Sequence, residues 1–204
     1  MKNLKESLLD DEDILLDKTG DKVLIEKFLK DNYNVSGRLS IRKNKGKWLV
    51  SGHWFEVKNE VKKTLASLTN DMFEFYKADY FSCEACENLT SLKGGPQIIE
   101  SSFVCTECEN LKSLEGCPRK IGSELHISGS TNIKNFKYFP ETVLNLYMCD
   151  CGKIKISDIK NILPNVRHLI NLTPSINIDK DKIIKEFPDK KTQGKINIIK
   201  YDFF

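Results

Sequence analysis

Hydrophobic and polar positions alternate over short stretches in the middle of the chain, and each stretch leads into a pair of spaced leucines. From Phe81 to Glu84 the apolar residues fall on every second position, the period of a strand with one buried face. Leu89 and Leu92 then lie three residues apart, which predicts a helical or 3₁₀ turn that closes onto the strand. Gly94 and Pro96 end that turn. The pattern predicts a unit of strand, turn and return.

This unit recurs along the chain with a spacing of about 22 residues. Residues 81–94 and 103–116 match almost position for position, and further copies begin at Leu125 and Leu146. One unit cannot bury its own apolar side, so we expect the copies to stack with their strands parallel. Fainter copies flank the clear ones: upstream at residues 55–68, and downstream where Val166, Leu169 and Asn171 align with Val143, Leu146 and Met148.

The repeat resembles the leucine-rich repeats. Its run F-x-C-x-x-C-x-x-L-x-x-L-x-G-x-P is similar to the short type with "LTSLEG-x-P" cores found in bacteriophage and gut-bacterial proteins. The match rests on Leu89–Gly94 (LTSLKG) and Leu111–Gly116 (LKSLEG). The resemblance implies an α/β repeat fold, a leucine-rich-repeat-like β-solenoid with parallel strands. It also implies a habit of binding other molecules, and it supplies no activity.

The termini are predicted to cover the ends of the stack, as repeat folds require. Residues 1–50 form a helical and hairpin cap in this interpretation, and residues 51–204 form the repeat region with a C-terminal capping strand at 196–204. A helix is expected over residues 21–31, with Val23, Leu24, Phe28 and Leu29 on its buried side. A turn at residues 43–47 would join strands around 39–41 and 48–50. The acidic stretch at 10–13 is expected to be a solvated link.

The cysteines allow two interpretations. Cys83 and Cys86 are separated by 18 residues from Cys105 and Cys108, a spacing that zinc sites also show. However, the repeat aligns Cys83 and Cys105 with Ile127 and Met148, and it aligns Cys86 and Cys108 with Ser130 and Cys151. Because isoleucine and serine occupy the same slots in other copies, the cysteines are interpreted as interior thiols and not as zinc ligands. The second slot is expected to hold a small hydrogen-bond donor for the backbone carbonyls of the turn. We therefore expect no metal and no cofactor, with Cys117 and Cys149 the more reactive thiols.

A binding face follows from the same alternation, because the outward strand positions of successive copies form one surface. Trp54 and Tyr147 are the expected anchors, since aromatic residues dominate interface energies. The alternative is that this face tolerates mixed residues or packs against a second copy. The predicted face consists of Trp54, Glu56, Ser82, Glu84, Val104, Thr106, His126, Ser128, Tyr147 and Cys149.

Composition and charge narrow the class of protein. With 40% hydrophobic and 30% charged residues, the 204-residue chain is expected to be globular, without a membrane span. Seven cysteines, an odd number, and no secretory signal favour a reducing cytoplasm. The net charge of +3 is uneven, at +5 over residues 152–204 and −2 over the rest. No catalytic motif is present. Of the three histidines, His53, His126 and His168, the last two are expected to point outward with no apparent partner for a base, so no enzyme is expected.

The sequence therefore favours a non-enzymatic protein–protein interaction module. In line with the resemblance, it would be phage-encoded and dock onto a host protein. One alternative is a zinc-containing nucleic-acid-binding protein that uses the paired cysteines and the basic C-terminal end, although we do not expect nucleic acid as a partner. Another is a structural component of a phage particle, which would self-associate.

Overall fold

The computed structural model describes residues 20–151, 154–172 and 178–198. Ten strands in this part of the chain form one mixed sheet in which all pairs but the first are parallel. The strands are β1 (Tyr33–Asn44), β2 (Lys47–Val57), β3 (Glu74–Ser82), β4 (Ile98–Ile99), β5 (Ser102–Val104), β6 (Lys120–Ile121), β7 (Glu124–His126), β8 (Val143–Tyr147), β9 (Val166–Leu172) and β10 (Ile196–Ile198).

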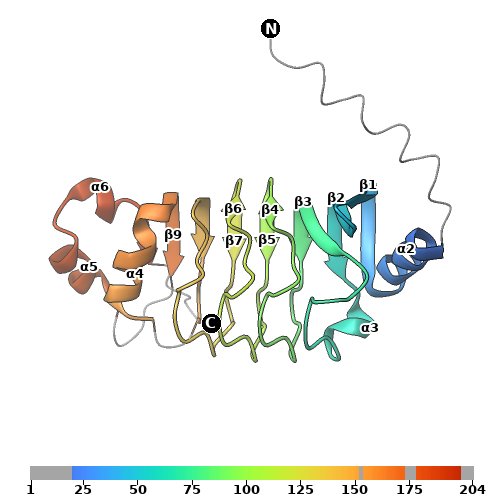
Figure 1. Cartoon of the computed structure of the whole chain (residues 1–204). Helices are drawn as coiled ribbons and strands as arrows, with labels where there is room; N and C mark the ends of the chain where they lie inside the picture. The colour runs from blue at the N-terminus through green and yellow to red at the C-terminus, as the bar shows by residue number, and fades with distance from the viewer. Residues whose placement is uncertain (1–19, 152–153, 173–177, 199–204) are drawn as a thin grey trace, which may run out of the picture.

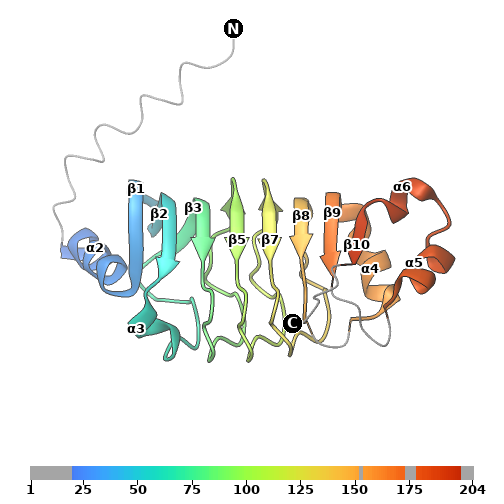
Figure 2. The ribbon, with the colours of Figure 1, turned by 180° about the vertical axis from the view of Figure 1, so that it is seen from behind.

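The strands lie side by side in one row, with helices at both ends (Figures 1 and 2). Along this row the order is β1-β2-β3-β5-β7-β8-β9-β10, while β4 pairs with β3 and β6. Helix α2 lies beside β1 at one end, and α4, α5 and α6 lie at the other (Figure 1). None of the described helices is long and apolar enough to cross a membrane. The helices are α2 (Gly20–Asn32), α3 (Asn59–Lys62), α4 (Ile156–Ile162), the 3₁₀ turn η1 (Leu163–Asn165), α5 (Lys180–Glu186) and α6 (Lys190–Gln193).

The predicted register of the clear copies is confirmed. Phe81 lies opposite Phe103, Phe103 opposite Leu125, and Leu125 opposite Leu146, and all four side chains are buried. The upstream copy joins the series, because Phe55 lies opposite Phe81. The buried side chains of the successive copies belong to one continuous hydrophobic core.

The predicted register of the downstream copy is wrong by one residue. Val166 lies opposite Val143 as expected, but Leu169 lies opposite Asn145 instead of Leu146. The cause is an irregularity in the β8–β9 ladder, where β9 uses one residue more than β8 to cover the same step. Ile170 consequently takes the inward position opposite Leu146.

The N-terminal helix and hairpin form as predicted, although the buried side of the helix differs. Ile25 and Leu29 of α2 are buried, whereas Val23 and Leu24 are 63% and 56% exposed. Residues four apart share one helix face, so once Leu29 packs on the sheet, Ile25 accompanies it and the two earlier residues turn away. The hairpin turns at Lys45–Gly46, both with positive φ, as tight hairpin turns require.

Only some of the remaining predictions for the two ends of the chain fall on described residues. Ile196–Ile198 forms β10, which pairs in parallel with β9 and ends the row. The remainder of the predicted capping strand, residues 199–204, and the acidic stretch at 10–13 lie outside the described residues. β2 runs through residue 50, so the hairpin and the repeats share one sheet.

An asparagine ladder joins the turns of neighbouring copies. The side-chain amide of Asn110 donates to the carbonyl of Glu87 at 2.7 Å, and Asn132 donates to Glu109 at the same distance. Asn88 bonds the Lys63 carbonyl in the same way. These contacts satisfy turn carbonyls that the sheet leaves unpaired, and they fix the spacing between copies.

Candidate functional site

One face of the sheet carries an unbroken row of side chains, which we call the central row. Its members lie directly opposite one another across eight strands, so their positions are set by the backbone ladder. Five of them, on β2, β3, β5, β7 and β8, belong to the predicted face. The central row consists of Asn34, Glu56, Ser82, Val104, His126, Tyr147, Asn171 and Asn197.

A second row of the predicted face follows at the ends of these strands. The amides of Ala85, Glu107 and Gly129 donate to the carbonyls of Thr106, Ser128 and Cys149, which sets Glu84, Thr106, Ser128 and Cys149 beside one another. The Thr106 hydroxyl also donates to the Glu84 carboxylate at 3.2 Å. The structure therefore brings together the predicted residues from β3 onward.

The prediction for the first copy was wrong by two residues. Glu56, not Trp54, lies opposite Ser82, and Trp54 lies opposite Tyr80. The rings of Trp54 and Tyr80 stack with centroids 3.6 Å apart and planes 12° from parallel. Tyr80 was missed, although it precedes the inward Phe81 just as Trp54 precedes the inward Phe55.

Two predicted face residues are not accessible. Ser82 and Cys149 are only 1% and 4% exposed. Their side chains are short, and on a sheet face longer neighbouring side chains can cover short ones. The other eight predicted residues are exposed or half-buried.

A second aromatic cluster lies on β7 and β8. The rings of His126 and Tyr147 stack with centroids 4.3 Å apart and planes 3° from parallel. Glu124 contacts both, with 3.0 Å to His126 Nε2 and 3.5 Å to the Tyr147 hydroxyl, which donates to it. Burial, followed by the Glu124 carboxylate, raises the pKa of Tyr147, so the phenol stays protonated. The two aromatic pairs thus hold their side chains in fixed orientations, which lowers the entropy lost on binding.

The buried thiols act as donors between copies. The side chains of Cys108, Ser130 and Cys151 donate to the backbone carbonyls of Cys83, Cys105 and Ile127, at 3.1, 2.9 and 2.8 Å. Each donor reaches the copy before its own. The expectation of a small donor in this slot is confirmed, and the serine shows that the slot selects for a donor and not for sulfur.

The geometry favours interior thiols over a zinc site. Among the described residues, no three or more His, Cys, Asp or Glu side chains converge in a way that could hold a metal ion. Burial raises the pKa of Cys86 to about 12, as expected for a protonated thiol that packs in the core. The two thiols expected to be reactive do not fit that role either. Burial raises the pKa of the Cys117 thiol, and Cys149 is buried.

The donor slot gives a direct prediction. Cys108→Ser is expected to leave the free energy of unfolding within about 1 kcal/mol of the original, because the hydroxyl can bond Cys83 as Ser130 bonds Cys105. Cys108→Ala leaves that buried carbonyl without its donor and should cost about 2 kcal/mol more. Urea titrations of the two variants measure the difference. Equal losses would show that the hydrogen bond contributes nothing to stability.

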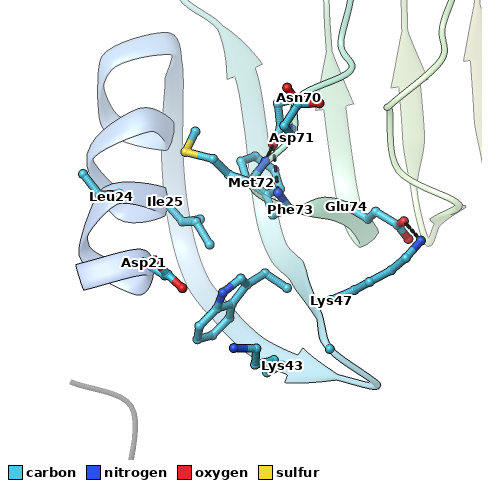
Figure 3. Close-up of a pocket in the computed structure, with 12 residues that line it drawn as sticks. Asp21, Leu24, Ile25, Lys43, Lys47, Asn70, Asp71, Met72, Phe73 and Glu74 are labelled. Carbon is cyan, nitrogen blue, oxygen red and sulfur yellow. Dashed lines mark hydrogen bonds and ion pairs between the residues drawn. The ribbon is translucent and has the colours of Figure 1, made fainter. Parts of the chain in front are cut away.

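A cavity of about 560 Å³ opens between α2, the hairpin turn and residues 70–74 (Figure 3). Apolar side chains such as Ile25 and Phe73 share its lining with charged ones such as Asp21, and the Lys47–Glu74 ion pair also lines it (Figure 3). The lining contains no Ser, Thr, Cys or His, so it lacks the usual nucleophile with a partner base.

Histidines lie at the surface, as predicted for His126 and His168. His53 contacts Asp79 at 2.6 Å, with its side chain 59% exposed, and His168 contacts the Asn145 side chain at 3.0 Å. In the part of the chain that the structure describes, neither histidine forms a hydrogen bond with a Ser, Thr or Cys side chain that could act as a nucleophile. The candidate site is therefore the sheet face.

Comparisons with known proteins add no relative: no family model, no curated protein and no solved structure matches this chain.

Proposed function

We propose that this chain is a non-enzymatic protein-binding module that docks onto its partner through the sheet face. The central row carries the proposal, because backbone pairing aligns it over eight strands and six of its eight side chains are exposed or half-buried, all but Ser82 and Asn171. Extended faces of this kind suit a protein partner better than a small molecule, which needs an enclosed pocket. The stacked pairs Trp54–Tyr80 and His126–Tyr147 would supply the anchors.

We further propose that the fold is a leucine-rich-repeat-like β-solenoid. Support comes from the parallel pairing of equivalent strands and from the inward slots that recur in each copy. Residues 1–50 would form the cap of the first repeat and residues 51–204 the repeat region. Tyr33, which follows α2, packs edge-on against Phe55 and Phe75 and so covers the first copies.

A reducing, cytoplasmic compartment fits this proposal. Six of the seven cysteines are buried. Oxidation of thiols that fill the core and donate to carbonyls would disrupt the packing of the copies.

Site-specific photocrosslinking in the native cells tests the proposed function. A benzophenone amino acid at Val104, half-buried in the centre of the row, is expected to capture a single protein. Tyr138 in the segment that leads to β8 is the control position, because it is aromatic and 41% exposed. Capture of the same protein from both positions, or of nothing at Val104, would contradict the proposal. A crosslink to a second copy would instead indicate self-association.

A further inference from the structure

Charge is separated within each copy. Residues 82–91, 104–111, 124–133 and 145–151, which hold the face positions and the turns after them, contain six carboxylates and no Lys or Arg. The intervening segments 92–103, 112–123 and 134–144 contain six Lys or Arg and three carboxylates. The whole chain has a net charge of +3, so the negative charge of these segments does not follow from the overall composition. The six carboxylates, which we call the acidic set, are Glu84, Glu87, Glu107, Glu109, Glu124 and Asp150.

The acidic set is accessible and largely unneutralised. All its members are exposed except Glu124, which is half-buried. Among the described residues, no Lys or Arg forms an ion pair with Glu84, Glu87, Glu107 or Glu109. In contrast, carboxylates of the connecting segments pair with cations of neighbouring copies. Lys77 lies 2.6 Å from Glu100, Lys93 lies 3.0 Å from Glu115, and Arg119 contacts Glu141.

Some members of the acidic set are fixed in place beside the aromatic pairs. Glu84 accepts from Thr106, and Glu124 contacts both His126 and Tyr147. At the β2 end, Glu56 of the central row lies 4.0 Å from Lys62. Aromatic faces next to carboxylates are favourable surroundings for ammonium and guanidinium groups, through charge and through the ring quadrupole.

We propose that the partner presents an extended segment rich in Lys or Arg, which crosses the strands over the acidic set. This inference rests on the proposed function and specifies the chemistry of the partner. Neighbouring strands lie about 4.8 Å apart, so β3 to β8 covers about 14 Å, which about five residues of extended chain would cross. Glu84 and Glu107 lie two and three positions after the central row, and Glu124 lies two positions before it on β7, so the segment would run obliquely across the strands. Its cationic side chains would meet Glu84 and Glu107 near the strand ends, and Glu124 beside the His126–Tyr147 pair. A nucleic acid would be repelled, because its phosphates would face the same carboxylates.

A binding measurement with a defined probe tests the inference. A fluorescent peptide of about eight residues, alternating arginine and serine, is titrated with the full chain and followed by anisotropy. Saturable binding is expected, weakening as salt increases from about 0.05 to 0.3 M. The variant E84Q/E107Q/E124Q is expected to bind at least about tenfold more weakly. The matched control E100Q/E115Q/E141Q removes three carboxylates from the connecting segments and is expected to bind as the original does.

Each outcome decides. Equal weakening in both variants, no saturable binding by the original chain, or equally tight binding of a peptide that alternates glutamate and serine would overturn the inference. Equally tight binding of single-stranded DNA would overturn it too. Thermal melts of both variants show whether the substituted chains are folded. If Val104 still captures a protein whose binding is unaffected by E84Q/E107Q/E124Q, the basic segment is excluded while the proposed function stands.

Discussion

Gly116→Ala is expected to destabilise the fold by about 4 kcal/mol or more, which is exceptional for the addition of one methyl group. Gly116 has φ +89°, and a Cβ there would lie 2.3 Å from the Lys93 amide nitrogen and 2.4 Å from the Leu92 carbonyl carbon. Both atoms belong to the backbone of the preceding copy, so no side-chain rotation can relieve the clash. The turn passes against its neighbour at a distance that only glycine allows.

Gly46→Ala is the matched control for this prediction. Gly46 has φ +81°, but a Cβ there would meet nothing within 4 Å. Gly46→Ala should therefore lower the free energy of unfolding only by the strain of an alanine in the left-handed conformation, about 1 to 2 kcal/mol. Urea unfolding of both variants, followed by circular dichroism, gives the two losses. Similar losses would mean that the copies do not approach each other as closely as described.

Stability is expected to fall steeply in alkali because the thiols are buried. Burial raises the pKa of Cys86 to about 12. For Cys105, a hydrogen bond from Cys83 lowers the pKa, but burial and neighbouring thiols raise it to a net value of about 11. In the unfolded chain a cysteine ionises at about 8.5. Above that pH the unfolded state loses protons that the folded state retains, so the free energy of unfolding decreases as pH rises.

The size of the alkaline effect follows from the same linkage. Each such thiol contributes a loss of about 1.4 kcal/mol per pH unit between its unfolded and folded pKa values. Cys86 and Cys105 together should remove about 3 kcal/mol per unit near pH 10, and below about pH 8 their stabilisation should be complete. Urea titrations in reductant at several pH values measure this slope.

The variant Cys86→Ser distinguishes the contribution of this thiol to the pH dependence from that of other groups that ionise in alkali. Tyr33 also has a pKa raised by burial, so the slope of the original chain is not due to thiols alone. Serine does not ionise in this range and occupies the equivalent slot as Ser130. For Cys86→Ser, the free energy of unfolding should decrease with pH less steeply than for the original chain, by about 1.4 kcal/mol per pH unit. Parallel slopes for the two proteins would refute the assignment.

The register of the central copies could be predicted from the sequence because residues 81–94 and 103–116 share nine of their fourteen residues, including all the cysteines and leucines. Equal spacing then fixes which residues face each other, and the donor role of the second cysteine slot followed from its exchange with Ser130. The one-residue shift in β9 could not be predicted, because an irregularity in a ladder depends on how two particular strands meet.

Exposure was harder to predict than register. Alternation places Ser82 and Cys149 outward, but only the structure shows that both are buried. Helix periodicity alone did not decide which side of α2 is buried, because Val23 and Leu24 are as apolar as Ile25 and Leu29. The choice is made by the packing of the helix on β1 and its neighbours.

The backbone conformation of the turns could not be predicted from the sequence either. Ala85, Glu107, Gly129 and Asp150 occupy the same position in successive copies, and all have positive φ, from 54° to 74°. Only one of them is glycine, so residue type gave no signal for the left-handed turn. Both the cross-copy approach of Gly116 and these turns are set by the stacking of copies, which is not visible in any one copy.

Hydroxyl-radical footprinting tests the central claim, that the sheet face is the surface covered by the partner. Trp54, Tyr80, His126 and Tyr147 are oxidisable side chains on that face, and Tyr138 serves as the internal reference. With the protein captured at Val104 bound, oxidation of the four face residues should drop while that of Tyr138 is unchanged. Protection of Tyr138 with no change at the four face residues would contradict the claim.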